Sequence, residues 1–447
     1  TEVVITAPIR NRMGLARARV GSNPTLSGCI AGGKKFKFFI FATIFFISTT
    51  TFAAAFQLWE ESAASLGDYH AGGAAEANDA SSIFYNPAGM MRLKHQELSA
   101  GVVYIPLDVT YHGNIVSTVF GTTTTPPNGV SGETENVVPN FHYVLPINQR
   151  VAFGFEETTP FGLSTNYANI NNVGLLATKT DLRTFNLNPS VAFEVNRYLS
   201  LGAGFDAMYG EAIYDDAFQF FGSLTNSLKG WGYGYNAGGL WQFDPKTRLG
   251  LSYRSAITLD LKGLSDMENI STTVSAQFPL PATTTLSFYR DVSNRWAMMT
   301  SVFYTEWSSF RKLMMHNISQ GTFGPASISL FENYRNTWNF SVGSRYRLNH
   351  FISLEAGVGH DETPTRIPYR DIRLPDASRF AASFGVNMHP MKDIIVNAGW
   401  THFFVGRTNV DNTGSNAGST TEFPPATGVG YVDSQVNVFG LQLTWII

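Results

Sequence analysis

The chain contains 447 residues, and its charged content of 15% lies well below the share of about 25% that is usual for soluble globular proteins. Aromatic residues make up 14% of the chain and glycine occurs 41 times, which suits a β-barrel whose outer wall faces lipid. No apolar run of about 18 residues or more follows residue 55, which excludes membrane-spanning helices from that part of the chain.

Residues 34–55 have the three parts of a secretory signal peptide. The basic start Lys34-Lys35-Phe36-Lys37 precedes a short apolar segment that reaches Ile47, and small residues follow up to Ala55. The apolar segment is too short for a membrane anchor. We therefore expect export of the protein and cleavage after Ala53 or Ala55. We interpret residues 1–33 as an upstream extension caused by a start site assigned too early.

Charge and cysteine content limit the chemistry of the processed chain. Removal of residues 1–55 takes away seven of the 31 basic residues and one of the 34 acidic residues, and leaves a net charge of −9. A chain this acidic is a poor ligand for nucleic acid. Because Cys29 is the only cysteine, the processed chain has no disulfide, thiol nucleophile or thiolate metal site.

Residues 56–95 are rich in Ala, Gly and Ser and have little hydrophobic periodicity, so they cannot build a core alone. They include Asn86-Pro87-Ala88-Gly89, in which Asn-Pro is a turn signal and the Asn side chain can bond to nearby backbone. We predict that this segment is a plug, or hatch, hydrogen-bonded to the inner wall of a barrel formed by residues 96–447. The four-residue motif can also serve only as the turn into the first strand.

After His95 the chain repeats about ten residues of alternation followed by a turn. In the clearest case the apolar positions alternate with small and polar ones, because successive side chains of a strand point to opposite faces. These apolar positions are Phe185, Leu187, Pro189, Val191, Phe193 and Val195.

Fourteen such segments are present, and short connections between them alternate with long ones. This is the layout of an outer-membrane barrel, and an even number of strands places both ends of the barrel on the periplasmic side. The predicted fold is all-β, a 14-stranded antiparallel transmembrane β-barrel plugged by the hatch. A soluble β-sandwich also alternates but rarely needs so many strands of this length. The segments begin near Gln96, Val137, Val151, Leu182, Leu199, Trp231, Arg248, Ala282, Arg295, Thr337, Phe351, Arg379, Asp393 and Ser434.

An ordered set of motifs covers nearly the whole processed chain and resembles the FadL family of outer-membrane long-chain fatty-acid transporters. No single motif carries the resemblance; their order does. The motifs are Phe56-Gln57-Leu58, Ala71-Gly72, Asp79-Ala80, Asn86-Pro87-Ala88, Pro160-Phe161-Gly162-Leu163-Ser164-Thr165, Thr180-Asp181-Leu182, Asn186-Leu187-Asn188, Leu280-Pro281-Ala282, Trp307-Ser308-Ser309-Phe310 and Arg373-Leu374-Pro375-Asp376-Ala377-Ser378-Arg379.

The resemblance implies uptake of long-chain fatty acids by diffusion through the plugged barrel, with sideways exit through a gap at an inward kink of the third strand. We place this kink at Pro160-Phe161-Gly162-Leu163, since Pro removes a ladder donor and Gly permits a bulge. The same residues can also be an ordinary loop start.

A fatty-acid pocket needs apolar walls and a cation for the carboxylate. The alternation of side chains along each strand predicts three inward arginines, Arg254, Arg345 and Arg347. An inward arginine, however, often pairs with a wall carboxylate such as Glu355 or Asp260. The adaptable side chains of Met314 and Met315, in a long connection, are further candidates for apolar contact with the ligand.

No catalytic motif or metal-spaced histidine cluster is found, so we expect neither an enzyme, nor a metal, nor a cofactor. The alternatives to fatty-acid uptake are uptake of other hydrophobic compounds, such as aromatic hydrocarbons, or a structural or adhesive surface protein. The expected location is the outer membrane of a Gram-negative bacterium. The expected partners are a hydrophobic small molecule, outer-membrane lipid and lipopolysaccharide, and the barrel-assembly machinery; we expect a monomer.

Overall fold

The computed structural model describes residues 55–117, 123–126, 128–167, 171–218, 222–415 and 426–447. The chain divides into two units, residues 1–46 and 47–447, and all described residues belong to the second. The predicted upstream extension and signal peptide up to residue 54 therefore lie outside the described residues, as does Cys29. Among the described residues no helix is both long and apolar enough to cross a membrane.

The strands join one antiparallel sheet, and the sheet closes because β22 pairs with β1 from Glu97↔Ile446 to Ser117↔Ala426. Eight crossings of the wall are single strands. They are β1 (Glu97–Ser117), β4 (Thr134–Asn148), β7 (Lys179–Asn196), β8 (Leu199–Phe218), β9 (Gly222–Asp244), β18 (Ile352–Asp361), β19 (Arg379–Met391) and β22 (Ala426–Ile446).

Six further crossings consist of two strands each, and two short strands, β2 (Thr123–Thr124) and β3 (Val130–Ser131), pair with β1. The two-strand crossings are β5 (Val151–Thr158) with β6 (Gly162–Asn166), β10 (Thr247–Arg254) with β11 (Ile257–Met267), β13 (Thr283–Asp291) with β12 (Ile270–Leu280), β14 (Trp296–Thr305) with β15 (Lys312–Ser319), β17 (Thr337–Arg347) with β16 (Pro325–Phe331), and β20 (Ile394–Val405) with β21 (Thr408–Asp411).

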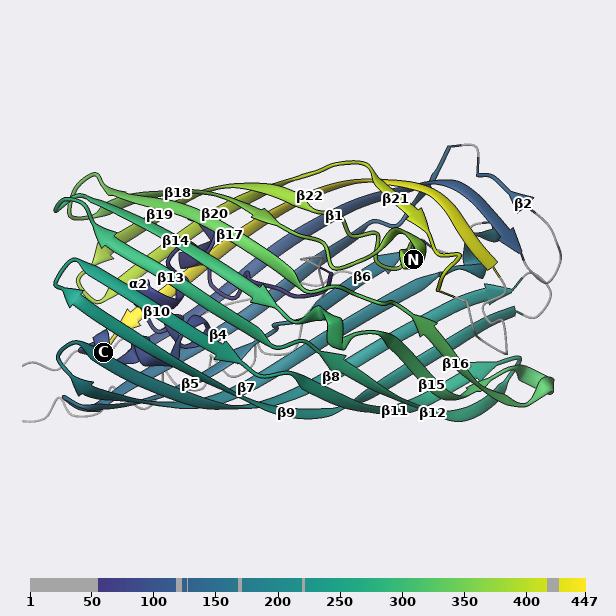
Figure 1. Cartoon of the computed structure of the whole chain (residues 1–447), viewed down its shortest axis with the longest axis horizontal. Coiled ribbons are helices and arrows are strands. Elements are labelled where there is room, and N and C mark those ends of the chain that lie inside the picture. Colours follow the sequence, from purple (N-terminus) through teal and green to yellow (C-terminus); the bar gives the residue numbers. More distant parts are fainter. Residues whose placement is uncertain (1–54, 118–122, 127, 168–170, 219–221, 416–425) are drawn as a thin grey trace, which may run out of the picture. The chain divides into compact units, whose positions relative to one another are not determined.

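The described chain thus forms a closed barrel of fourteen crossings, as the sequence predicts. Figure 1 shows that the short turns, such as those between β7 and β8 and between β17 and β18, gather at the end where the chain terminates. The longer connections lie at the opposite end. In an outer-membrane barrel the short turns face the periplasm.

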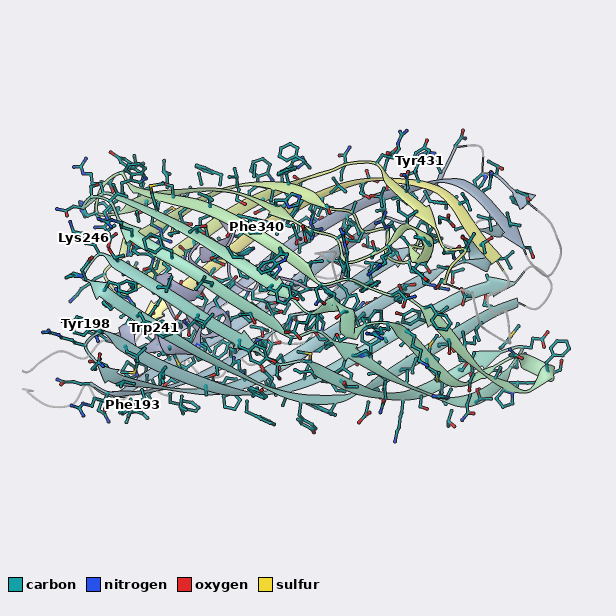
Figure 2. The ribbon with its side chains drawn as sticks, in the orientation of Figure 1. Phe193, Tyr198, Trp241, Lys246, Phe340 and Tyr431 are labelled. Atoms are coloured by element: carbon teal, nitrogen blue, oxygen red, sulfur yellow. The ribbon has the colours of Figure 1, made fainter. Side chains whose placement is uncertain are left out.

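The two faces of the wall are inverted relative to a soluble protein, as β7 shows. Its polar or small side chains Asn188 and Ser190 are buried inside, at 0% and 2% exposure. Its apolar side chains Val191 and Phe193 are 56% and 47% exposed on the outside, and Figure 2 shows Phe193 projecting from the wall. An apolar exterior around a polar interior is the arrangement expected of a wall in lipid.

The hatch occupies the barrel interior, in the half that holds the short turns (Figure 1). It contains three short helices and a 3₁₀ segment: α1 (Ala63–Leu66), α2 (Gly73–Glu76), α3 (Ser82–Tyr85) and η2 (Pro87–Arg92). Glycines of the wall let its backbone approach closely. A Cβ at Gly250 would lie 1.9 Å from the Ala74 oxygen, and a Cβ at Gly202 would lie 2.5 Å from the Ala88 nitrogen.

Other 3₁₀ turns lie in the connections between strands. They are η3 (Asn171–Leu175), η4 (Trp307–Ser309), η5 (Gly321–Phe323) and η6 (Ile367–Tyr369).

Candidate functional site: a strand break beside an apolar lumen

The third crossing of the wall is interrupted where the sequence predicts a kink. β5 ends at Thr158 and β6 begins at Gly162, and both pair with β7 on one side. Proline in the intervening segment has no N–H to donate to the ladder, which favours a break at this point. The role of the break as a lateral opening remains a prediction.

The first residues of the hatch bind the broken segment as a short strand would. Gln57 forms an isolated antiparallel bridge with Phe161. The Leu58 N–H donates to the Pro160 oxygen at 2.8 Å, and the Gly162 N–H donates to the Phe56 oxygen at 2.8 Å. The hatch thus satisfies backbone groups that the wall ladder leaves unpaired.

On its other side the broken crossing separates from β4. The β4–β5 ladder ends at Phe141↔Glu157, although β4 continues along the wall to Thr134. Beyond that point the hydrogen bonds described between the two sides are few. Thr134 Oγ1 donates to the Ser164 oxygen at 3.2 Å, and the Asn166 N–H donates to the Gly132 oxygen at 3.5 Å. We call this unpaired stretch between β4 and the segment from Thr158 to Ser164 the wall gap.

Aromatic side chains fill the lumen beside the break. The Phe56 ring lies 4.7 Å from Trp307, 5.5 Å from Phe278 and 5.5 Å from Phe310 between ring centroids. It also lies 6.1 Å from Phe161, and all five side chains are at most 4% exposed. We call these five residues the aromatic cluster. They make an apolar interior at a level where the lumen of a water-filled porin would be polar.

A cavity of about 30 Å³ adjoins the aromatic cluster at Phe161, and Pro160 and Arg254 also line it. Its other lining residues are Gln57, Trp59, Phe84, Tyr85, Met208, Ser252, Ser255, Ile257, Leu280, Pro281, Thr283 and Thr285. Its walls are largely apolar, and Arg254 is its one cationic lining residue. A cavity of this size holds about one water molecule, so a larger ligand must displace side chains.

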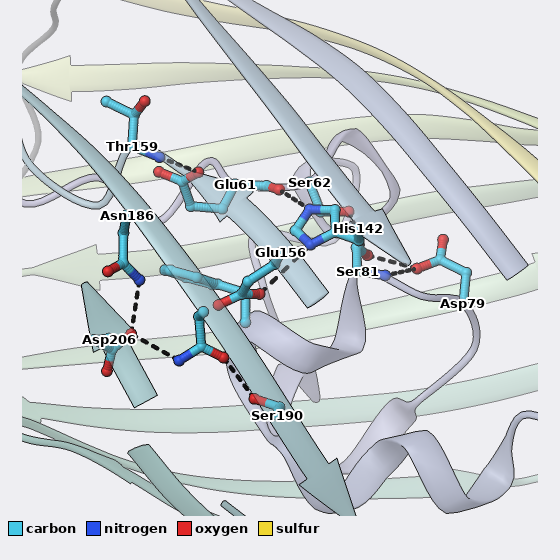
Figure 3. Close-up of polar contacts among 12 residues, drawn as sticks. Glu61, Ser62, Asp79, Ser81, His142, Glu156, Thr159, Asn186, Ser190 and Asp206 are labelled. Carbon is cyan, nitrogen blue, oxygen red and sulfur yellow. Dashed lines mark hydrogen bonds and ion pairs between the residues drawn. The ribbon is translucent and has the colours of Figure 1, made fainter. Parts of the chain in front are cut away.

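Arg254 is not a free cation. It forms ion pairs with Asp206 and, at 3.0 Å, with Glu156, and it donates to the Phe84 backbone oxygen at 3.3 Å. Asn186 and Asn188 also donate to Asp206, at 2.7 and 2.9 Å, which Figure 3 shows. The wall therefore balances the buried guanidinium with two carboxylates.

The same polar network reaches the hatch through Glu61 and His142 (Figure 3). The Thr159 N–H donates to the Glu61 carboxylate at 3.0 Å, and His142 Nε2 lies 3.0 Å from the Glu61 backbone oxygen. His142 Nδ1 lies 3.5 Å from Glu156. A chain of polar contacts thus connects the strand break to Arg254.

Buried carboxyl groups of the hatch favour their neutral form. Burial raises the pKa of Glu60 to about 7. Burial also raises the pKa of Glu61 well above its usual value, and the nearby carboxylates of Glu157 and Glu156 reinforce this shift. Desolvation disfavours a charged carboxylate more strongly here than neighbouring hydrogen bonds favour it.

The hatch motif has its expected backbone contacts. The Asn86 amide donates to the oxygens of Ala74 at 2.7 Å and Gly239 at 3.0 Å, and accepts from the Ala88 N–H at 3.0 Å. Pro87 begins η2, and a Cβ at Gly89 would lie 2.9 Å from the Ala77 side chain. Asn86 therefore ties two parts of the hatch to the wall.

The remaining candidate residues lie away from the cavity. Arg345 contacts Glu76 of the hatch at 2.5 Å and Glu355 at 2.7 Å, so the structure pairs it with the wall carboxylate that parity suggested. Arg347 is exposed and lines a second cavity of about 390 Å³ between the hatch and the short turns.

The two methionines, which the sequence pattern places in a long connection, lie instead in strand β15. They face opposite sides of the strand, so they do not form one apolar surface. Met315 is buried at 5% exposure. Met314 is partly exposed on the other side and lines an outer groove. Leu163 is buried beside the break, opposite Leu182 on β7.

Asp260 corrects one expectation. The sequence offered it as an inward partner for arginine, but it is exposed on the outer face of β11. The interruption at residues 255–256, between β10 and β11, shifts the alternation: Arg254 is inward, and then Ile257, Leu259 and Leu261 are buried. A parity argument carried across a strand interruption therefore fails.

The partners of Arg254 were not singled out from the sequence. Glu156 lies on β5 two positions after Gly154 and four after Ala152, both of which are small. Every second side chain of a strand points to the same face, so this pattern would have placed Glu156 inside the barrel. Phe56 was recognised as part of a motif, but its packing against Trp307 depends on tertiary contacts that no local pattern reveals. Among the described residues, no group of three or more His, Cys, Asp or Glu side chains can hold a metal ion.

Comparisons with known proteins agree with this architecture. The family model described as outer membrane protein transport protein (OMPP1/FadL/TodX) matches residues 44–445. A long-chain fatty acid transport protein of Escherichia coli is 30% identical over 405 residues, which cover 79% of this chain and 87% of the relative.

Two solved structures share the fold. A FadL homologue of Pseudomonas aeruginosa superposes with a TM-score of 0.78 at 24% identity and covers 88% of this chain and 100% of its own. The toluene transporter TbuX of Ralstonia pickettii superposes with a TM-score of 0.62 at 16% identity, covering 87% of this chain and 100% of its own.

Proposed function

The chain belongs to the OMPP1/FadL/TodX family of outer membrane transport proteins, and we propose that it takes up long-chain fatty acids and releases them sideways through the wall gap. Membership makes it an outer-membrane transporter of hydrophobic compounds and not an enzyme. The fatty-acid substrate and the lateral exit belong to the proposal.

The observation that carries the proposal is the adjacency of the strand break, the aromatic cluster and the arginine-containing cavity. Phe161 belongs to the broken segment, packs in the cluster and lines the cavity. An acyl chain that replaces Phe56 among the aromatic side chains would therefore lie next to the wall gap. Burial of each methylene of the acyl chain contributes about 0.8 kcal/mol, which favours long chains.

The carboxylate end has a partner in Arg254. A guanidinium has five N–H donors, and that of Arg254 makes three hydrogen bonds to other described residues. Because Glu156 and Asp206 already balance its charge, the carboxylate of a fatty acid would replace one of them as the counter-ion. Among the superposed structures, the FadL homologue of Pseudomonas aeruginosa is also more similar to this chain than TbuX is, at 24% against 16% identity. Aromatic hydrocarbons remain the alternative substrate, because the cluster alone would accept them.

Substrate class is tested by binding to the purified protein. We expect oleate to bind at least tenfold more tightly than oleyl alcohol, which has the same chain without the charge, and more tightly than toluene. Equal binding of oleate and oleyl alcohol would remove the role of Arg254. Tighter binding of toluene would move the function to aromatic hydrocarbons.

The exit route is tested by filling the wall gap. Asn140 lies on β4 where the wall gap begins, and its side chain faces inward. Its amide has no hydrogen-bond partner in the described part of the chain. We expect Asn140→Trp to abolish uptake of tritiated oleate by cells that lack their own transporter. Val342→Trp, on the outer face of β17, is the matched control and should transport normally. Normal uptake by a folded Asn140→Trp variant would exclude exit at this point.

A further inference from the structure

Two lysines face each other on the outside of the wall. Lys229 of β9 and Lys262 of β11 are directly opposite in the ladder, and both are exposed. Their chain neighbours Leu228 and Leu261 are buried at 2% and 1% exposure, so alternation directs the two lysines outward. Like charges in directly opposite positions destabilise a pair of strands.

The positive surface continues across the next strands. Lys262 is opposite Ser275 of β12, and Ser275 is opposite His316 of β15. Lys312 lies on the same outward face of β15 as His316. An outer groove of about 540 Å³ is lined by Lys262, Lys312 and His316, together with Thr258, Asp260, Leu261, Ser275, Ala276, Gln277, Pro279 and Met314.

Aromatic residues show where this surface lies relative to the membrane. Trp231 is exposed, and it is opposite Asp260, two positions toward the short turns from the lysine pair. Tryptophan on the outside of such a barrel marks the boundary of the apolar band. Two residues along a strand span about 7 Å, so Lys229 and Lys262 lie just beyond this boundary, at the level of lipid head groups on the long-loop side.

The protein balances the charge of the three lysines only in part. None of Lys229, Lys262 and Lys312 forms an ion pair with a described residue, whereas arginines such as Arg254, Arg345 and Arg379 do. Two carboxylates lie nearby. Glu211 is opposite Lys229, and Asp260 accepts from Gln277 at 3.4 Å. Three lysines against two carboxylates leave a positive excess on this face.

We propose that Lys229, Lys262 and Lys312 form a binding site for the phosphate groups of a phosphorylated glycolipid in the outer leaflet of the outer membrane. Phosphate between Lys229 and Lys262 would remove their repulsion, and a second phosphate would reach Lys312 along the groove. The acyl chains of the same lipid would lie on the apolar wall below Trp231. The site is separate from the transported substrate, which binds inside the barrel, and it depends only on the outer-membrane location.

The test measures binding of bisphosphorylated lipid A to the full protein by native mass spectrometry. One variant is Lys229→Gln/Lys262→Gln/Lys312→Gln. Its matched control is Lys246→Gln/Lys392→Gln/Arg295→Gln, which removes three exposed charges from the short turns. Each surface lysine strengthens an anionic lipid contact about fivefold, so we expect binding about a hundredfold weaker in the first variant. The control should retain wild-type binding.

Two further measurements complete the test. Heat-modifiable electrophoretic mobility verifies that both variants are folded barrels. Dephosphorylated lipid A should bind the wild type as weakly as lipid A binds the first variant. Equal lipid A binding by both variants, or equal binding of the two lipids by the wild type, would overturn the proposal. Displacement of lipid A by an equal concentration of inorganic phosphate would instead indicate a site for soluble anions and would also overturn it.

Discussion

The hatch contacts the wall in two different ways in two parts of the lumen. Residues 62–79 of the hatch are held by directed polar contacts. Gln442 donates to Asp79 at 2.9 Å, Ser62 donates to Gln442 at 2.9 Å, and Arg248 donates to the Ala75 oxygen at 2.9 Å. The first residues of the hatch also form hydrogen bonds with the broken segment, but the Phe56 side chain enters the aromatic cluster, where it packs edge-on against Trp307. Hydrogen bonds specify one position, whereas apolar contacts are non-directional.

This contrast identifies the part of the hatch that a hydrophobic ligand can displace. An acyl chain cannot replace the polar partners of Asp79, because buried polar groups would lose their hydrogen bonds. It can replace the Phe56 ring, since one apolar group substitutes for another. The first residues of the hatch also bind the strand break, so a ligand that displaces Phe56 would act on the wall gap directly.

The largest effect is expected where a polar contact is buried. Arg254→Met leaves Glu156 and Asp206 without their cation, and loss of one partner of a buried ion pair costs about 3–5 kcal/mol. We expect this loss of unfolding free energy in urea titrations of the reconstituted protein. The exposed residue Arg347 provides the control, and Arg347→Met should change stability by less than about 0.5 kcal/mol. Equal stability of the two variants would contradict the buried network.

The apolar part is tested by Phe56→Ala. Truncation of a buried Phe costs about 3–5 kcal/mol, depending on how far the site can collapse, and we expect about 3 kcal/mol. The loss should be local and should appear as faster hydrogen exchange at Leu58 and Gly162, whose amides bond across the break. Phe340→Ala, on the outer face of β17, should leave both amides protected. Protection that is unchanged in Phe56→Ala would show that the cluster does not hold the break.

The stability of the hatch should depend on pH through its buried carboxyl group Glu60. Burial raises the pKa of Glu60 from its usual value near 4.5 to about 7, so the seated hatch favours the protonated form. The stability that protonated Glu60 gives to the seated hatch is therefore fully present below about pH 4.5, and it is lost as the pH rises through about 7. The total is about 3–3.5 kcal/mol.

The measurement is hydrogen exchange of the hatch between pH 4.5 and 8, corrected for intrinsic exchange. We expect less protection at high pH in the wild type. Glu60→Gln keeps a neutral side chain at every pH and should remove the part of this dependence that comes from Glu60. If Glu60→Gln retains the full pH dependence of the wild type, the dependence comes from other carboxyl groups, such as Glu61.

The sequence predicts the wall better than the site, for a physical reason. Alternation in β7 identifies Val191 and Phe193 as outward because period two is a property of every strand. The Pro160–Gly162 signal locates a break because proline cannot donate to a ladder. The pairing of Arg254 with Glu156 and Asp206 joins three strands, so it depends on the register of the closed sheet and not on local sequence.

The smallest predicted effect concerns the hydroxyl that holds the strand break. Thr184 Oγ1 accepts from the Phe161 N–H at 3.1 Å and donates to the Phe161 oxygen at 2.7 Å, so one side chain satisfies two groups of the broken segment. Thr184→Val removes both bonds and keeps the shape, which should cost about 1–2 kcal/mol of local stability.

Exchange at the Gly162 amide should therefore be roughly tenfold faster in Thr184→Val, whereas exchange at residues of β22 should not change. Thr284→Val is the matched control, since the Thr284 hydroxyl has no hydrogen bond within the described residues. If the gap is the exit, Thr184→Val should also transport oleate at least as fast as the wild type, because the bonds it loses keep the segment closed. Slower transport together with faster exchange would show that the strand break is not the exit route. The aromatic cluster would then be the part of the site that determines uptake.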